Sequence, residues 1–395
     1  MSDVFQTPQL DDLELAVLDL IAELRTEMRH RVAEPRRWSG GLRRMSEARA
    51  VQASNSIEGY NATLDDVIAV QDGDEPMDAD TETQRAVEGY QEAMTYVLQA
   101  TQDAELEVDE GLLRALHFMM LKHDLAKNPG RWRPGAIHVE RTGTGEIVYE
   151  GPDADDVPAL ITSALRELEE SDAPVLVKAA MAHLNLVMIH PFSDGNGRMA
   201  RCLQTLVLAR ERIAAPVFSS IEEYLGRNTQ AYYDILAEVG GGSWQPENEA
   251  RPWLHFCLTA HYRQSTTLLR RVQAFEEMWT AASRIVSQRR LPERTIGPIA
   301  EAAYGQRIKR ATYLRSVEIT WGERVADLTA SRDLRAIVNA GLFVPIGDTR
   351  ARYYLATDEL KAEWEKIRGK WSKRPEVDDP FEIAASRAQL SLEIS

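Results

Sequence analysis

The stretch HPFSDGNGRMAR, residues 190–201, decides how this chain folds and what it can do. Apolar segments flank it at residues 179–189 and 199–209, which predicts a turn between two helices that opens the second helix. Gly195 and Gly197 let the backbone bend and direct its N–H groups outward. The start of a helix adds partial positive charge to those groups. The stretch therefore predicts a cradle for anions, suited to phosphates.

The charged side chains of the same stretch complete a reaction site. Arg198 and Arg201 are three positions apart, so they project from one helical face and can grip phosphates through bidentate hydrogen bonds. Asp194 is a hard oxygen ligand of the kind that Mg²⁺ takes beside substrate phosphates. His190 can accept a proton near neutral pH. Together these residues predict transfer of a group from a nucleoside triphosphate to a hydroxyl.

Residues 190–201 resemble the complete motif of the Fic family, H-x-F-x-(D/E)-G-N-G-R-x-x-R, and the resemblance extends over roughly residues 40 to 265. That family is known for AMPylation, in which AMP passes from ATP to a Ser, Thr or Tyr hydroxyl of a target protein. The resemblance implies that His190 is the general base, that Phe192 anchors the loop and that Asp194 binds the metal. It implies nucleotide contacts from Gly195, Asn196, Gly197, Arg198 and Arg201, with Asn196 near the α-phosphate and the arginines on the outer phosphates.

A second motif lies at Ser54-Asn55-Ser56-Ile57-Glu58-Gly59. Residues 43–57 have helix-forming composition, Ser54 and Glu58 share a face, and Gly59 is typical of a helix end. A glutamate at that end opposes the helix dipole and is better satisfied by an outside cation, for which Arg201 is the natural partner. The segment resembles the family's inhibitory motif, (S/T)-x-x-x-E-(G/N), which implies that Glu58 occupies the space of the γ-phosphate. The alternative is an ordinary amphipathic helix with a capping glycine.

Residues 130–139 and 146–152 flank a glycine-rich turn, which predicts a β-hairpin with open edges. An extended target segment can add to such an edge. The family has a flap here, which implies that Ile137, His138 and Val139 dock the target; an exposed hairpin without a partner is the alternative. Further along, Tyr232 and Tyr233 lie where the family forms its adenine pocket, although aromatic helix faces are more often part of the core.

Composition sets the outer bounds. The chain has 395 residues, of which 44% are hydrophobic, and this size allows two or three domains. No uninterrupted apolar stretch is long enough for a membrane helix, and the first residues lack the features of a secretory signal. Cys202 and Cys257 form no metal-ligand pattern, which favours a reduced, cytoplasmic protein. The net charge of −16 argues against the surface as a whole binding nucleic acid.

The charge is unevenly distributed. Residues 284–352 hold 13 Lys or Arg and 7 Asp or Glu, a net charge of +6, which leaves −22 for the rest of the chain. Such asymmetry indicates a separate domain with a different partner. Two short helices are expected at residues 325–328 and 334–338, with Thr329 and Ser331 as caps between them. Gly341 would stop the second helix, before a strand–turn–strand unit that ends at residue 355.

This order resembles a winged helix-turn-helix domain over residues 284–360. Arg332 and Arg335 would be exposed on the recognition helix, and Arg350 and Arg352 on the wing. Such a unit can reach a DNA major groove or pack against protein, and both readings stay open. Residues 372–395 are expected to form a mobile tail.

The sequence therefore predicts a mainly α protein with three parts before the tail. Residues 1–100 would be an N-terminal helical region with the inhibitory helix, 101–265 a Fic-type core with a β-hairpin flap, and 284–360 the winged domain. The expected function is a protein adenylyltransferase that uses ATP and Mg²⁺, acts on a protein that could be the chain itself, and is inhibited by Glu58. Alternatives are removal of AMP, transfer of another nucleotide, and a DNA-binding regulator that senses ATP. An oligomer is also compatible with the sequence.

Overall fold

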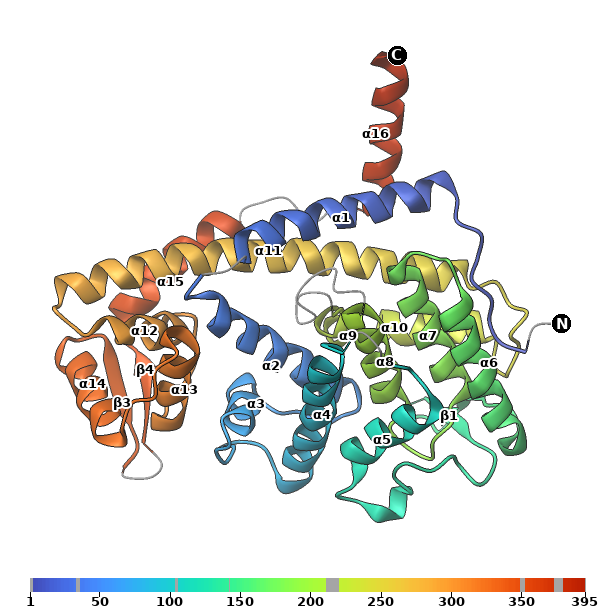
Figure 1. Cartoon of the computed structure of the whole chain (residues 1–395), viewed down its shortest axis with the longest axis horizontal. Coiled ribbons are helices and arrows are strands. Elements are labelled where there is room, and N and C mark those ends of the chain that lie inside the picture. The colour runs from blue at the N-terminus through green and yellow to red at the C-terminus, as the bar shows by residue number, and fades with distance from the viewer. Residues whose placement is uncertain are drawn as a thin grey trace.

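The computed structural model describes residues 3–32, 36–103, 106–141, 143–210, 220–348, 352–372 and 379–394. The fold is mainly helical, as predicted, with two small antiparallel hairpins (Figure 1). Two long helices, α1 (Asp12–Val32) and α11 (Arg251–Gln288), run side by side along one edge of the molecule (Figure 1). The other elements are attached to this pair in two groups.

The N-terminal helices begin and end where short polar side chains satisfy free backbone groups. Thr63 forms a capping box with Asp66, and the Asp80 carboxylate accepts the N–H of Thr83. The helices are α2 (Ser39–Ile57), α3 (Leu64–Gln71), α4 (Thr81–Ala100) and α5 (Glu110–Leu121).

The central part contains the predicted hairpin and the pair of helices around the phosphate motif. The hairpin strands are β1 (His138–Glu140) and β2 (Ile147–Glu150), whose register shifts between Val139 and Glu140. The helices are α6 (Val157–Glu170), α7 (Val175–Ile189), α8 (Asn196–Arg210), α9 (Glu222–Arg227) and α10 (Thr229–Gly240). Short 3-10 turns occur at η1 (Leu125–Lys127), η2 (Ala154–Asp156) and η4 (Glu293–Thr295). Helices α7 and α8 pack on each other and are buried on almost every side, which places the loop between them at the centre of the fold.

The C-terminal part has the element order helix–turn–helix–hairpin. It comprises α12 (Ile296–Ala303), α13 (Arg310–Trp321), α14 (Asp327–Asn339), β3 (Phe343–Ile346), β4 (Tyr353–Ala356) and α15 (Asp358–Ser372). Ile308 and Tyr354 exchange both backbone hydrogen bonds at 2.9 Å, so a third short segment extends the hairpin. The classification as a winged helix-turn-helix domain stays a prediction. Arg350 lies outside the described residues.

The prediction of two short helices at residues 325–338 was wrong. Residues 327–339 form one continuous helix, α14, and the helix before it is α13. Thr329 and Ser331 lie inside α14 and cap nothing between helices. The apolar residues Ala330, Leu334 and Ile337 are buried at helical spacing, so one amphipathic face explains the whole segment.

The prediction of a mobile tail was also wrong for residues 379–394, where α16 (Pro380–Ile394) is described. It packs across α1 and projects from the body of the molecule (Figure 1). Ala384 is buried, the Phe381 ring lies 4.3 Å from the His255 ring, and Arg387 pairs with Glu23. The early turns of α16 are therefore attached to the rest of the chain.

Two hydrophobic cores lie along the α1–α11 pair. The large core contains α7, α8 and the first part of α11, and the small core contains the second part of α11 and the C-terminal elements. Helix α11 therefore belongs to both cores. It continues without a break between residue 265, where the predicted Fic-type core ends, and residue 284, where the predicted winged domain begins. Helix α2 is shared in the same way: Leu42 and Met45 lie in the small core, and Val51 and Ile57 in the large one.

Helix α2 begins tightly against the C-terminal part. A Cβ added at Gly40 would lie 2.3 Å from the Cγ2 of Ile319, so only glycine allows this approach. One turn later, Arg44 donates to Asp72 at 2.8 Å and to Glu301 at 2.9 Å, and all three side chains are buried. These contacts connect α2 to the end of α3 and to α12.

We expect Arg44→Met to lower the free energy of unfolding by about 3–5 kcal/mol, because it leaves two carboxylates buried without their cation. The measurement is urea denaturation of the full chain. Arg324→Met is the matched control, since Arg324 pairs with Glu318 at the surface and its side chain is 89% exposed. That control should leave the free energy of unfolding nearly unchanged, because exposed ion pairs contribute little. Equal losses in the two variants would contradict a structural role for the Arg44 contacts.

Candidate active site

The loop between α7 and α8 is built by its own backbone and one side chain. His190 ends α7 in the left-handed region, with φ of 52°, and Gly195 has φ of 77°. The Asn196 side chain spans the turn: its Oδ1 accepts the N–H of Phe192 at 2.9 Å and its Nδ2 donates to the carbonyl of Phe192 at 2.8 Å. Helix α8 then begins at Asn196, as the sequence predicted.

This arrangement changes the expected role of Asn196. Its side chain is buried and both its polar atoms bond with the backbone of Phe192, so the amide also shapes the loop. The backbone N–H groups at the start of α8 have no partner within the helix and remain suited to an anion. The backbone N–H of Asn196 can contact a nucleotide, and one N–H of its Nδ2 is not used by Phe192.

Sequence reasoning missed His117 on α5, which supports the loop from below. Its ring stacks on Phe192 with centroids 3.7 Å apart and planes at 4°. Its Nδ1 accepts the N–H of Gly130 at 2.8 Å, so the proton is on Nε2, which donates to the carbonyl of Asp194 at 2.9 Å. Burial lowers the pKa of His117 to about 4, which keeps the ring neutral. Nothing in the local pattern of α5 signals this contact.

His190 is oriented as a base requires. Its Nδ1 lies 3.0 Å from the carbonyl of Val187 and donates to it, which leaves Nε2 unprotonated and able to accept a proton. Burial lowers the pKa of His190, which favours that neutral form. Arg133, also missed from the sequence, donates from Nε to the carbonyl of His190 at 2.8 Å and thereby fixes the backbone at this position.

The two motif arginines are buried and only partly satisfied. Arg198 and Arg201 are each 1% exposed. Among the described residues, Nε and Nη1 of Arg198 and Nη1 of Arg201 have no hydrogen-bond partner. The Arg198 guanidinium lies over the Tyr60 ring, 5.1 Å from its centroid. Buried donors without partners are costly, so these atoms are suited to an anionic ligand.

The remaining donors of Arg201 reach the end of α2. Its Nε donates to the Ser54 hydroxyl at 2.8 Å, and its Nη2 donates to the Ser54 carbonyl at 3.0 Å and to the Glu58 carboxylate at 2.6 Å. Burial alone would lower the pKa of Arg201, but Glu58 raises it above its ordinary value. Ser54, Glu58 and Arg201 are therefore together, although Arg201 lies far along the chain from the other two.

Gly197 makes room for this pair. A Cβ at position 197 would lie 2.4 Å from the Oε1 of Glu58 and 3.1 Å from the Nη1 of Arg201. Gly59 adopts φ of +88° directly after Glu58, consistent with the predicted helix end. The second motif glycine thus allows the Glu58 carboxylate to approach the start of α8.

Asp194 lies at the open side of the loop, with its side chain 37% exposed. Its Oδ2 pairs with the Nζ of Lys127 at 2.7 Å, and Lys127 also donates to the Tyr60 hydroxyl at 3.2 Å. Burial would raise the pKa of Asp194, but Lys127 holds it below its ordinary value, so the carboxylate is charged. The described residues contain no group of three or more His, Cys, Asp or Glu side chains that could hold a metal. Mg²⁺ would fit here as an ion held by one carboxylate and substrate phosphates.

The hairpin lies beside this loop and has one edge free for a ligand strand. On the β2 side, the N–H of Glu150 donates to Gly242 at 3.0 Å. On the β1 side, Ile137 and Val139 are half-buried and His138 is exposed. Arg133 fastens the hairpin to the loop, because it donates to the Pro152 carbonyl as well as to His190.

The assignment of Tyr232 to a base-binding site was wrong. Its side chain is 1% exposed, and its hydroxyl bonds with the Nε2 of His183 at 2.9 Å in the large core. A ring buried on all sides cannot stack on a nucleobase. Tyr233 is 42% exposed, and its hydroxyl donates to the Ile57 carbonyl at 3.0 Å, next to Glu58. It therefore remains available at the rim of the site.

Comparison with known proteins agrees with this geometry. Residues 107–208, which hold the loop, match the Fic/DOC family, so this segment is a Fic domain. The protein adenylyltransferase Fic of Nematostella vectensis is 26% identical over 255 residues, covering 60% of this chain and 54% of the relative. The protein of that name from Drosophila yakuba is 29% identical over 252 residues, covering 62% and 46%. The aligned part is about half the length of each relative.

A solved structure shares the fold over most of the chain. The crystal structure of a Fic family protein from Desulfovibrio desulfuricans G20 superposes with a TM-score of 0.56, at 22% identity. The superposition covers 89% of this chain and 98% of that protein. No helix in the described part of this chain is long and apolar enough to cross a membrane.

The neutral histidines predict a pH dependence of stability. Burial lowers the pKa of His117 to about 4 and that of His183 to about 3, from an ordinary 6.5. Between about pH 6.5 and 4 the unfolded chain binds protons that the folded rings do not, so the free energy of unfolding decreases as the pH falls through that window. Each ring accounts for a decrease of up to about 1.4 kcal/mol per pH unit. The free energy of unfolding, measured by urea denaturation at several pH values in this range, should change less steeply with pH for His117→Gln than for the wild type. An identical pH dependence of the two proteins would show that His117 is not held neutral.

Proposed function

We propose that this chain transfers AMP from ATP to a Ser, Thr or Tyr hydroxyl of a protein, and that Glu58 inhibits the transfer. The observation that carries the proposal is the set of buried guanidinium donors of Arg198 and Arg201, at the start of α8, that have no partner in the described part of the chain. A triphosphate supplies the acceptors that these donors need. The names of the relatives, both protein adenylyltransferases, support the same reaction.

The proposed reaction uses the free nitrogen of His190. As the target hydroxyl attacks the α-phosphorus, His190 Nε2 takes its proton; a new P–O bond forms, and pyrophosphate leaves with the electron pair of the broken bond. Arg198, Arg201 and the N–H groups of α8 would neutralise the charge that develops on the phosphates. Asp194 would hold Mg²⁺, which supplies further positive charge when bound. Positioning of the two reactants contributes much of the rate.

The free edge of β1 is suited to present the target. An extended segment can pair with Ile137, His138 and Val139 through backbone hydrogen bonds. Arg133 connects the hairpin to the carbonyl of His190, so a segment bound at this edge lies at a defined place relative to the base. The residue types on this edge do not restrict the sequence of the target, which could belong to another copy of this chain.

Inhibition follows from competition for Arg201. Glu58 accepts from Nη2 of Arg201 at 2.6 Å and occupies the approach to its guanidinium. A γ-phosphate placed on Arg201 would meet this carboxylate, and two anions repel each other at close range. ATP would then bind with its phosphates displaced and its α-phosphorus out of line for attack.

Replacement of His190 tests the reaction. His190→Ala should abolish transfer of label from α-labelled ATP to protein and leave ATP affinity nearly unchanged, because the base acts in the transition state and the phosphate contacts act in binding. The measurements are label incorporation in a cell lysate and ATP binding by calorimetry. Normal incorporation by the variant would remove His190 from the mechanism.

Replacement of Glu58 tests the inhibition. Glu58→Gly should raise the initial rate of AMP incorporation roughly 5- to 150-fold, the rate equivalent of a charge-assisted contact of about 1–3 kcal/mol. Realignment of the phosphates would add to this gain. Arg201→Ala is the comparison: it breaks the same pair but removes a phosphate contact, so it should not be activated.

The outcomes separate two enzyme reactions. Equal rates for the wild type and Glu58→Gly would show that Glu58 does not inhibit. If Glu58→Gly instead loses an ability to remove AMP from modified protein, Glu58 is a base for that hydrolysis, and AMP removal becomes the activity.

A further inference from the structure

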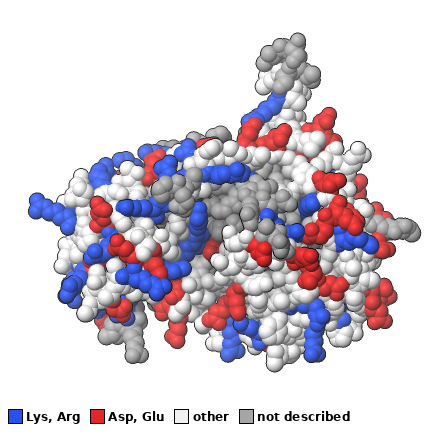
Figure 2. Space-filling model, in the orientation of Figure 1, with Lys and Arg blue, Asp and Glu red and all other residues white. Residues whose placement is uncertain are grey.

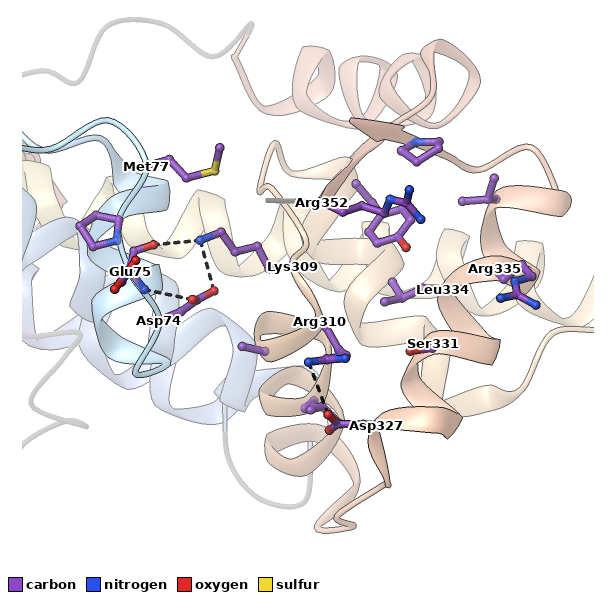
Figure 3. A pocket seen from close by; sticks show the side chains of 16 residues that line it. Asp74, Glu75, Met77, Lys309, Arg310, Asp327, Ser331, Leu334, Arg335 and Arg352 are labelled. Carbon is purple, nitrogen blue, oxygen red and sulfur yellow. Dashed lines mark hydrogen bonds and ion pairs between the residues drawn. The ribbon is translucent and has the colours of Figure 1, made fainter. Parts of the chain in front are cut away.

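A second site lies far from the loop between α7 and α8, between the N-terminal region and the C-terminal part. It is a cleft of about 1050 Å³ (Figure 3). One wall is residues 74–77, which follow α3. The other walls are the start of α13, one face of α14 and the β3–β4 hairpin. The floor is partly apolar, with Leu334, Val338 and Pro345 among its residues.

Cations from three elements converge on this cleft. Lys309 and Arg310 stand at the start of α13, Arg335 lies on α14 and Arg352 directly precedes β4 (Figure 3). Arg335 has no hydrogen bond or ion pair within the described part of the chain. Arg310 pairs with Asp327 at 3.4 Å, and Arg352 pairs with Asp348 at 3.7 Å and donates from Nε to the Gly347 carbonyl at 3.4 Å; all of these contacts are exposed. Exposed pairs of this kind contribute little, so these guanidinium groups are available to a ligand.

The chain already places anions against these cations. The Nζ of Lys309 pairs with Asp74 at 3.2 Å and donates to the Glu75 carbonyl at 2.9 Å (Figure 3). Next to the cleft, Arg307 pairs with Asp78 at 2.8 Å. The acidic segment 74–78 therefore occupies one side of the cleft as a polyanion would. The carboxylates of Asp74 and Asp78 are partly exposed, so a ligand of higher charge density can compete for their cations. The backbone of the segment is held separately, because the buried Asp66 carboxylate accepts the N–H groups of Met77 and Asp78 at 2.8 and 3.1 Å.

The shape of the cleft selects among polyanions. Helix α14 has Arg332 and Arg335 exposed, and a two-stranded hairpin stands beside it. A helix of this kind enters a DNA major groove while neighbouring elements contact the backbone. The start of α13 lacks a side-chain cap and lines the cleft, and its positive end favours phosphate. Lys and Arg are prominent over the C-terminal half of the molecule, and acidic groups over the other half (Figure 2).

We propose that this cleft is a binding site for duplex DNA. Helix α14 enters the major groove, where Arg335 contacts the DNA, and Lys309, Arg310 and Arg352 contact phosphates. The Asp74 carboxylate competes with the DNA for Lys309 and gives up this pairing when the duplex binds. This site is separate from the nucleotide site, and its occupation requires no AMP transfer.

The test is fluorescence anisotropy of the full chain with a labelled DNA duplex of mixed sequence, about two helical turns long. Affinity should fall linearly with salt on a double-logarithmic plot. Arg335→Ala combined with Arg352→Ala should weaken binding at least about 10-fold and reduce the salt slope by roughly 1 for each lost phosphate contact. Asp74→Asn combined with Glu75→Gln should tighten binding, since it removes competing charge.

Arg324→Ala is the matched control, because Arg324 is an exposed cation of the same domain outside the cleft. It should bind DNA as the wild type does, and every variant should keep the wild-type circular dichroism spectrum and AMP transfer. Absence of binding at low salt would overturn the proposal, and so would equal weakening by Arg324→Ala and the double variant. Binding of a labelled polyglutamate peptide in place of duplex DNA, with the same dependence on Arg335 and Arg352, would overturn it in favour of an acidic protein.

Discussion

The buried cation of Arg201 is the constraint on which the rest of this structure depends. A guanidinium that is 1% exposed needs an anion or polar partners, because an unpaired buried charge is very costly. In this fold Ser54 and Glu58 supply those partners from another helix. The second motif glycine follows from the same need, since a side chain at Gly197 would prevent the approach of Glu58. The site is thus stable without a nucleotide because an internal carboxylate replaces it in part.

Helix α2 extends this constraint across the molecule. At its end, Glu58 contacts Arg201 of α8, and at its beginning Gly40 and Arg44 contact the C-terminal part. Arg44 is buried with Asp72 and Glu301, so both ends of the helix are held by arginine–carboxylate contacts of low exposure. Its apolar residues are divided between the two cores. The helix that places Glu58 beside Arg201 is therefore also a structural link between the two parts of the chain.

Residues outside the 190–201 motif hold the motif residues in position. His117 supports Phe192 and the Asp194 carbonyl, and Arg133 holds the His190 carbonyl and the hairpin. Lys127 keeps the Asp194 carboxylate charged. These residues set the backbone and the charge state, whereas the motif supplies the groups that would meet the substrate. A functional description limited to residues 190–201 would omit what keeps them in position.

The sequence by itself determined the helical fold, the turn before α8, the hairpin and the pairing of Glu58 with Arg201. Each of these rests on a local pattern or on a short motif with a strong physical requirement: glycines where the backbone bends, apolar periodicity, and a carboxylate at the wrong end of a helix. Tertiary structure alone decided which polar and aromatic residues lie in the interior. Tyr232 faces His183 and not a base, Asn196 bonds its own loop, and His117 reaches Asp194, because packing between distant segments sets those neighbours. Periodicity likewise could not show that residues 327–339 are one helix, or that α16 is attached to α1, since both depend on the surface that each segment finds to bury its apolar face.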